Sequence, residues 1–99
     1  MRKIEEQMLE AIRKNRNFKC RNTEVKSKNG FSKVYLHGNH IATYCRRFID
    51  FNLCGWNTPT TRSRLNAIGV NINQRNFKPY CNGVEINVCG WYRFSNFES

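Results

Sequence analysis

Acidic residues are scarce in this sequence, which contains seven Asp and Glu against 17 Lys and Arg and carries a formal net charge of +10. The positive charge is concentrated in residues 13–47, where ten basic residues accompany a single acid, Glu24. A surface of this kind attracts polyanions such as nucleic acid, an acidic protein face or anionic lipid. The alternative is a surface whose charge only keeps the protein soluble.

Long apolar runs are also absent, and none approaches the roughly 20 residues that a membrane-spanning helix requires. Residues 1–10 are charged where a secretory signal would need an apolar stretch, so we expect a cytoplasmic protein with no membrane partner. No Ser-, Gly- or Pro-rich linker divides the chain, and 39% of its residues are hydrophobic. These features predict one domain over residues 1–99 with a modest core.

The patterns that metal sites and catalytic sites require are missing as well. The five cysteines form no C-x2-C pair, and His37 and His40 are followed by no thiol before Cys45. This spacing predicts no metal ligand and favours reduced, buried cysteines. Acids beyond the first ten residues are too sparse to form a general acid–base pair, and no Gly-rich phosphate loop is present. We therefore expect no catalytic residue, no cofactor and no enzymatic activity.

Residues 2–16 have the periodicity of an amphipathic helix. Ile4, Met8 and Ile12 recur on one face, and charged residues occupy most of the remainder. A stripe this thin would hardly keep a helix folded without a partner. We expect it to dock on the domain or on a second copy of itself, and the second arrangement would make a homodimer.

Strand-like alternation follows in residues 23–54 and again in residues 70–94. Asn82-Gly83 is the clearest hairpin turn, a break is expected at residues 74–76, and residues 97–99 are expected to fray. Together with the helices, these segments predict an α+β fold. It consists of an N-terminal helix, an antiparallel sheet of hairpins or meanders, and one short inserted helix.

The inserted helix is predicted over residues 58–68, where both of its ends are marked. Thr58 is suited to the N-cap because its hydroxyl can accept a backbone N–H. Pro59 fits the first helical position, where a missing N–H has no consequence. Gly69 is suited to the left-handed residue that commonly follows a helix.

Helical spacing also divides the residues of this helix between two faces. Leu65 and Ile68 share a face with Thr61, and a helix of about ten residues needs such a face to pack against something. Arg62 and Arg64 point elsewhere, so both are expected to be exposed and to contribute little to stability.

A short pattern occurs twice: Asn52-Leu53-Cys54-Gly55-Trp56 reappears as Asn87-Val88-Cys89-Gly90-Trp91. Two copies are too few for a repeat architecture. In each copy we expect a strand to end at the glycine and the tryptophan to fold onto the sheet. A duplicated β-meander is the alternative.

Aromatic residues, among them Phe31, Tyr35, Tyr44 and Phe48, are interleaved with the basic residues of the first half. Cations bind phosphates and aromatic faces stack bases, although aromatic residues on strands more often belong to a core. The positive N-terminal end of the inserted helix would suit phosphate as well. We therefore predict a DNA- or RNA-binding protein that uses eight basic residues: Arg21, Lys26, Lys28, Lys33, Arg46, Arg47, Arg62 and Arg64.

Two segments bear a resemblance to known proteins. Residues 38–42 have the pattern G-N-x-I-A, and residues 56–67 have the pattern W-x-T-x-T-T-x-x-R-L-N-A. In these patterns, and over about residues 34–80, the chain resembles small proteins encoded by tailed bacteriophages. The resemblance implies a phage origin and action in the cytoplasm of an infected bacterium, and it carries over no catalytic residue.

The resemblance also keeps two other functions open. Many short phage proteins bind a host macromolecule, so the alternatives are an inhibitor or adaptor that binds a host protein, and a protein that sequesters an anionic nucleotide. Four polar residues of the helix pattern bear on this choice: Thr60, Thr61, Arg64 and Asn66. They serve either in helix capping and hydrogen bonding or as a polar contact surface.

Overall fold

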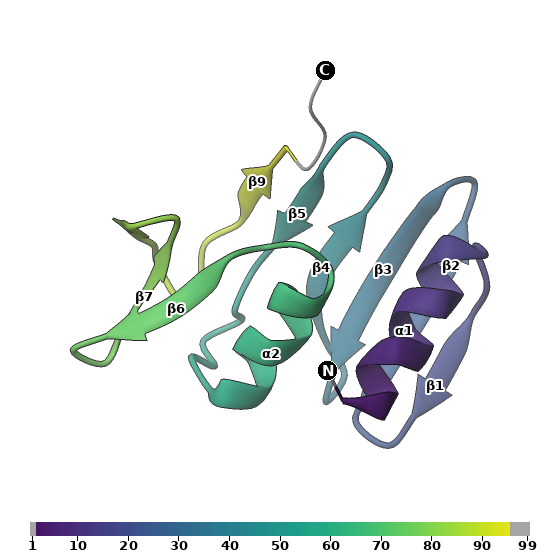
Figure 1. Cartoon of the computed structure of the whole chain (residues 1–99), viewed down its shortest axis with the longest axis horizontal. Helices are drawn as coiled ribbons and strands as arrows, with labels where there is room; N and C mark the ends of the chain where they lie inside the picture. Colours follow the sequence, from purple (N-terminus) through teal and green to yellow (C-terminus); the bar gives the residue numbers. More distant parts are fainter. Residues whose placement is uncertain (1, 96–99) are drawn as a thin grey trace.

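The computed structural model describes residues 2–95 (Figure 1). In chain order its elements are α1 (Lys3–Arg13), β1 (Phe18–Cys20), β2 (Thr23–Lys28), β3 (Phe31–Leu36), β4 (Asn39–Tyr44), β5 (Ile49–Phe51), α2 (Pro59–Ala67), β6 (Ile72–Arg75), β7 (Lys78–Cys81), β8 (Val84–Glu85) and β9 (Tyr92–Phe94). The predicted α+β class, with an N-terminal helix, antiparallel strands and one inserted helix, is confirmed. The prediction for residues 97–99 lies outside the described residues.

The strands form two antiparallel sheets, one of six strands in the order β1-β2-β3-β4-β5-β9 and one of three in the order β6-β7-β8. The sequence predicted a single sheet, and Asn66 at the end of α2 explains the difference. Its side-chain amide accepts a hydrogen bond from the Ile72 N–H (2.7 Å) and donates one to the Ile72 carbonyl (2.8 Å). Asn66 thus takes the place of a neighbouring strand and holds the start of β6 beside α2.

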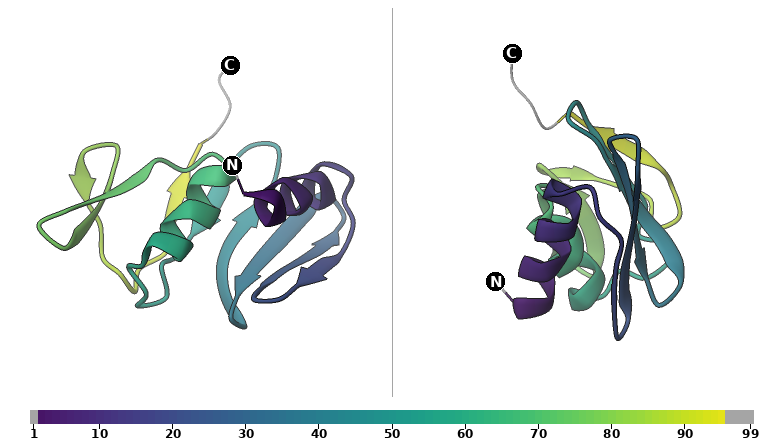
Figure 2. Two further views of the ribbon diagram at one scale, coloured as in Figure 1. Left: turned by 60° about the horizontal axis from the view of Figure 1, so that its bottom comes forward. Right: turned by 90° about the vertical axis from the view of Figure 1, so that its right-hand side faces the viewer.

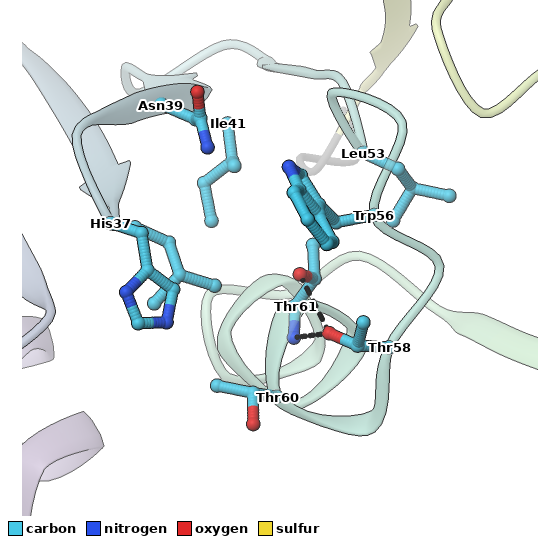
Figure 3. Close-up of a pocket in the computed structure, with 9 residues that line it drawn as sticks. His37, Asn39, Ile41, Leu53, Trp56, Thr58, Thr60 and Thr61 are labelled. Carbon is cyan, nitrogen blue, oxygen red and sulfur yellow. Dashed lines mark hydrogen bonds between the residues drawn. The ribbon is translucent and has the colours of Figure 1, made fainter.

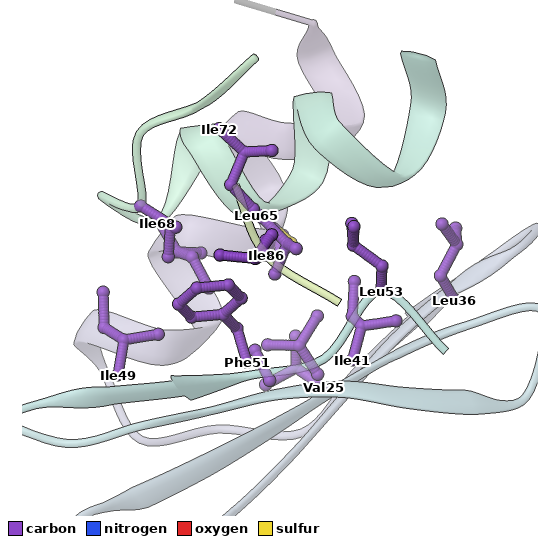
Figure 4. Close-up of a cluster of buried hydrophobic side chains, with 14 of the residues drawn as sticks. Val25, Leu36, Ile41, Ile49, Phe51, Leu53, Leu65, Ile68, Ile72 and Ile86 are labelled. Atoms are coloured by element: carbon purple, nitrogen blue, oxygen red, sulfur yellow. The ribbon is translucent and has the colours of Figure 1, made fainter. Parts of the chain in front are cut away.

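Both helices lie on the same face of the six-stranded sheet (Figure 2). The core fills the space between these layers, with Val25 and Phe51 contributed by the sheet and Leu65 by α2 (Figure 4). Met8 of α1 belongs to the same cluster. Inward residues alternate with outward ones along β2 and β3, as expected for a sheet with one covered face. The part of the chain that the structure describes leaves the other face without a covering layer.

Helix α1 is shorter than the predicted range of residues 2–16. Asn15 adopts a left-handed conformation (φ 55°), and the Arg16 N–H returns to the Ala11 carbonyl (2.8 Å), so the helix ends at Arg13. Met8 and Ala11 are buried where α1 packs on β2 of the same chain. A homodimer through α1 stays a prediction, and these two residues are not exposed for it.

Helix α2 begins and ends as predicted. Thr58 is the N-cap and its hydroxyl oxygen accepts the Thr61 N–H (3.2 Å), Pro59 is the first helical residue, and Gly69 follows the helix with φ 117°. Leu65 is fully buried, as the helical spacing predicted. The turn chemistry and the apolar spacing were therefore sufficient to place this helix.

Two strands differ from the prediction. β1 was not predicted, since three residues between basic neighbours are too few to show alternation. β6 continues to Arg75, and the turn falls at Asn76–Phe77, where both residues have positive φ (52° and 64°). A bulky residue rarely adopts this conformation, which is why the predicted break at residues 74–76 is misplaced. The Asn82-Gly83 hairpin turn is confirmed, with φ values of 52° and 84°.

The two copies of the repeated pattern lie side by side. In each copy the asparagine side chain accepts the cysteine N–H, from Cys54 to Asn52 and from Cys89 to Asn87, both at 2.8 Å. The Gly55 N–H donates to the Val88 carbonyl (2.7 Å) and joins the two turns. The asparagine bond is therefore common to both copies, whereas the backbone differs, because Cys54 and Gly55 have positive φ (57° and 80°) and Cys89 and Gly90 do not.

Arg64 corrects a prediction, because it is buried and not exposed. Only 4% of its surface is accessible, and its Nη1 donates to Glu5 Oε2 at 2.7 Å while its Nε donates to Thr23 Oγ1 at 3.0 Å. Helical spacing predicted that this face of α2 is exposed to solvent, whereas α1 packs against it and covers it.

The Glu5 carboxylate is stabilised in its charged form. Burial opposes its ionisation, but hydrogen bonds from Ser63, Arg64 and the Arg2 backbone, together with the charge of Arg64, lower the pKa of Glu5 below its ordinary value. Glu5, Arg64 and Thr23 therefore form a satisfied polar cluster that joins α1, α2 and β2.

Candidate nucleic-acid interface

The face of the six-stranded sheet opposite the helices, here called the open face, is rich in lysine and aromatic residues. Its residues on β2 and β3 alternate with those of the core, and the burial of the two strands follows that alternation. These residues are Glu24, Lys26 and Lys28 on β2 and Phe31, Lys33 and Tyr35 on β3.

Lys26 and Lys33 stand directly opposite each other in the register of β2 and β3, and both are exposed. Like charges at paired positions destabilise a sheet. Lys28 follows Lys26 on the same side of β2, so a third positive charge lies nearby. A bound anion would offset the repulsion among the three, which favours this part of the open face as an anion-binding surface.

A row of rings runs from β3 across β4 to the start of β9. The ring centroids of Tyr35 and His40 are 5.2 Å apart, and those of His40 and Trp91 are 5.0 Å apart. The Lys26 Nζ lies 5.2 Å from the centroid of the Tyr35 ring, which places a cation against one end of the row. The open face thus brings stacking groups and cations together.

His40 is held in place by a hydrogen bond between its Nε2 and Thr43 Oγ1 (2.8 Å). Burial lowers the pKa of His40 below its ordinary value, the Lys33 charge lowers it further, and the Ala42 backbone opposes both effects. The imidazole is therefore neutral at neutral pH and contributes an aromatic ring, and no charge, to the row.

The far side of the open face carries a paired charge. Arg93 donates to both carboxylate oxygens of Asp50, at 2.8 and 3.1 Å, and its guanidinium lies 3.7 Å from the centroid of the Phe48 ring. Because Asp50 neutralises Arg93, this side of the open face is less positive than β2 and β3.

The eight basic residues predicted from the sequence do not form one cluster. Lys26, Lys28 and Lys33 lie together on the open face. Arg46 and Arg47 are exposed in the β4–β5 turn, which lies at the same end of the meander as the β2–β3 turn after Lys28. These five residues therefore lie on the open face or at the end of the sheet toward which β2 runs.

The other three arginines lie elsewhere. Arg21 is exposed in the β1–β2 turn, at the opposite end of the strands. Arg62 Nη1 donates to the Asn57 carbonyl (3.1 Å) and to Gln74 Oε1 (3.0 Å), so it braces the loop before α2 against β6. Arg64 is the buried partner of Glu5 described above.

Sequence reasoning missed two members of the aromatic row, His40 and Trp91. His40 was considered only as a metal ligand, although its register opposite Tyr35 would have placed it on the same face. The repeated pattern marked Trp91, but no local feature indicates that it would contact a residue of β4. Of the predicted aromatic residues, Phe31 and Tyr35 lie on the open face, whereas Tyr44 packs against the core.

The model for the Kyanoviridae Gp96 protein family matches residues 1–98 of the chain. The chain belongs to this family of cyanophage proteins. The predicted phage origin is thereby confirmed, and the match extends beyond residues 34–80 to almost the whole chain. Comparison with curated proteins and with solved structures found no match.

Three of the four polar residues singled out in the helix pattern of this Kyanoviridae protein have structural partners. Thr61 is buried and bonded to the Thr58 cap, Arg64 pairs with Glu5, and Asn66 bonds the Ile72 backbone. The interpretation as capping and hydrogen bonding is therefore confirmed for these three residues. Thr60, together with Thr61, lines a pocket.

This pocket of the cyanophage protein, about 540 Å³ in volume, lies where α2 meets the β3–β4 turn. Figure 3 shows Trp56 and His37 on opposite sides of it, with Ile41 between them. Both patterns of the resemblance contribute lining residues: Asn39 and Ile41 from the first, and Trp56, Thr58, Thr60 and Thr61 from the second.

Residues 2–95 contain no group of three or more His, Cys, Asp or Glu placed to hold a metal ion. All five cysteines are free thiols. Burial raises the pKa of Cys54 and of Cys81, which keeps both thiols protonated and unreactive. Within the described part of the chain, neither helix is long and apolar enough to cross a membrane.

Proposed function

We propose that this cyanophage protein binds nucleic acid through the open face of its six-stranded sheet, inside the infected bacterium. The observation that carries the proposal is the convergence of Lys26, Lys28 and Lys33 on a face that no described element covers. Cations that release counterions from a phosphate backbone supply most of the affinity of non-specific binding. Arg46 and Arg47 extend the same positive region at the end of the sheet.

The test is reversal of the three lysines to glutamate in one variant, K26E/K28E/K33E. Because each lost phosphate contact removes about 0.7 units (single strands) to 0.9 units (duplex DNA) from the slope of log K against log salt, the slope should fall by about two to three units. Binding at 100 mM salt should be lost for DNA and for RNA. Fluorescence anisotropy with labelled oligonucleotides over a range of salt concentrations measures both effects.

A matched variant controls for net charge. Lys3, Arg13 and Lys14 are exposed on or at the end of α1, which lies on the other face of the sheet (Figure 2), so K3E/R13E/K14E changes the charge by the same amount. This variant should retain most of the affinity. Equal loss in both variants, or a parent protein that does not bind at 100 mM salt, would show that the open face is not the site.

A second candidate function is the binding of a small anionic nucleotide in the pocket beside α2. The composition of the pocket lining favours this function. Trp56 supplies an aromatic ring, aliphatic side chains supply apolar surface, and the threonines of α2 supply polar groups (Figure 3). The volume of about 540 Å³ lies within the usual range for small-molecule sites.

The expected result is a concentration-dependent rise in melting temperature when a nucleoside monophosphate is added, because a ligand that binds the folded state stabilises it. Trp56→Ala should abolish the rise, and Trp91→Ala, outside the pocket, should leave it unchanged. Differential scanning fluorimetry with each of the four nucleotides decides the question. No rise with any of them contradicts this function.

A further inference from the structure

We propose that the nucleic acid is single-stranded and that its bases stack on the row formed by Tyr35, His40 and Trp91. The inference rests on the proposed function of the open face and specifies which form of nucleic acid that face takes. The lysines alone would accept any polyanion. The row of rings supplies the distinction, because it can be used only by a ligand with accessible bases.

The rings of the row pack against one another in tilted pairs, with interplanar angles of 30° and 57°. Adjacent ring centroids are separated by 5.2 and 5.0 Å, and the rings come from three different segments of the chain, β3, β4 and the approach to β9. Trp91, at one end, is 50% exposed and offers the largest free surface of the three. A strand laid across β3 and β4 would therefore meet one ring after another.

Lys26 and Lys33 lie beside the aromatic row, where they could bind the phosphates of a single-stranded nucleic acid. Lys26 contacts the Tyr35 ring, and Lys33, opposite Lys26, is near enough to His40 to affect its titration. Phosphates bound by these lysines would hold the attached bases over the rings. Base stacking on aromatic residues combined with a cationic surface is the usual arrangement for single strands.

A duplex does not fit this arrangement. Its bases are already stacked on one another and its outer surface presents phosphates, so the rings of a sheet face would gain no contact. His40, held in place by Thr43, adds ring surface to the row, and this surface is of use only to a ligand with accessible bases. The open face is therefore expected to discriminate by strandedness and not by charge density.

The experiment compares three ligands of equal length with the whole chain: oligo-dT, an abasic oligonucleotide that keeps the phosphates, and a DNA duplex. The wild-type protein should bind oligo-dT at least about 10-fold more tightly than the abasic strand, since each stacked base contributes a factor of about 5 to 150. Trp91→Ala should weaken oligo-dT binding by a factor in that range and leave abasic binding unchanged. Trp91→Phe should restore most of the loss.

Phe77 supplies the matched control, since it is 88% exposed and lies in the β6–β7 turn, outside the six-stranded sheet. Phe77→Ala should not change oligo-dT binding, and in Trp56→Phe the remaining fluorescence of Trp91 should be quenched by oligo-dT. Tyr35→Ala tests the row independently if Trp91→Ala lowers the melting temperature. Equal binding of the abasic strand and oligo-dT, or tighter binding of the duplex, overturns this inference.

The outcome also separates this inference from the proposed function. If the lysine reversal abolishes binding while oligo-dT and the abasic strand bind equally, the open face binds phosphates and the stacking row is wrong. If the lysine reversal has no effect, both proposals fail together.

Discussion

Arg64→Ala is expected to lower the free energy of unfolding by about 3–5 kcal/mol, because it leaves the Glu5 carboxylate buried without its charged partner. The substitution also removes the donor to Thr23 Oγ1, so a second buried group loses its hydrogen bond. Urea denaturation followed by circular dichroism measures the change.

The Glu10–Lys14 pair of α1 is the matched control, because its 2.8 Å distance is close to the 2.7 Å of the buried pair while both of its side chains are about half exposed. Lys14→Ala should cost no more than about 0.5 kcal/mol. The buried Glu5–Arg64 pair also predicts that stability depends on pH. Since the pKa of Glu5 is lowered in the folded state, its contribution is present above the ordinary glutamate pKa and is lost as the pH falls below it. A cost for Arg64→Ala similar to that of Lys14→Ala would contradict the prediction.

Leu65→Ala should lower stability by about 2–5 kcal/mol, since Leu65 is fully buried between α2 and the sheet and its truncation leaves a cavity. Thr58→Ala, which removes the cap of the same helix, should cost only about 1 kcal/mol. Thermal and urea denaturation of the two variants would establish whether packing or capping contributes more to this helix.

Val84 is the control for Leu65, because it is also aliphatic but lies largely exposed on β8. Val84→Ala should change stability by less than about 0.5 kcal/mol. A Leu65→Ala variant as stable as Val84→Ala would mean that α2 is not anchored by its apolar face.

Much of the local structure could be predicted from the sequence because its causes are local. The hydroxyl of Thr58, the fixed φ of Pro59 and the Asn82-Gly83 turn each act within a few residues. The alternation of residues 23–54 likewise predicted strands in the region of β2 and β3 before their partners were known. These elements needed no knowledge of what lay across the core.

The rest depended on contacts between distant residues. Arg64 was assigned to solvent because nothing near it in the sequence shows that α1 would cover it. The exchange of hydrogen bonds between Asn66 and Ile72, which divides the strands into two sheets, gives no periodic pattern. The contact of Trp91 with His40, which completes the aromatic row, joins residues that the chain order keeps far apart.

The cluster of Glu5, Thr23 and Arg64 also has a consequence for the order in which the chain can fold. Glu5 and Arg64 are 59 residues apart, so during synthesis Glu5 cannot meet its ionic partner until residue 64 has left the ribosome. The β2–β3–β4 meander, which forms between neighbouring segments, can assemble earlier. Docking of α1 is therefore expected to be a late step, because the Glu5 carboxylate in its first turn can be buried only when Arg64 is present to pair with it.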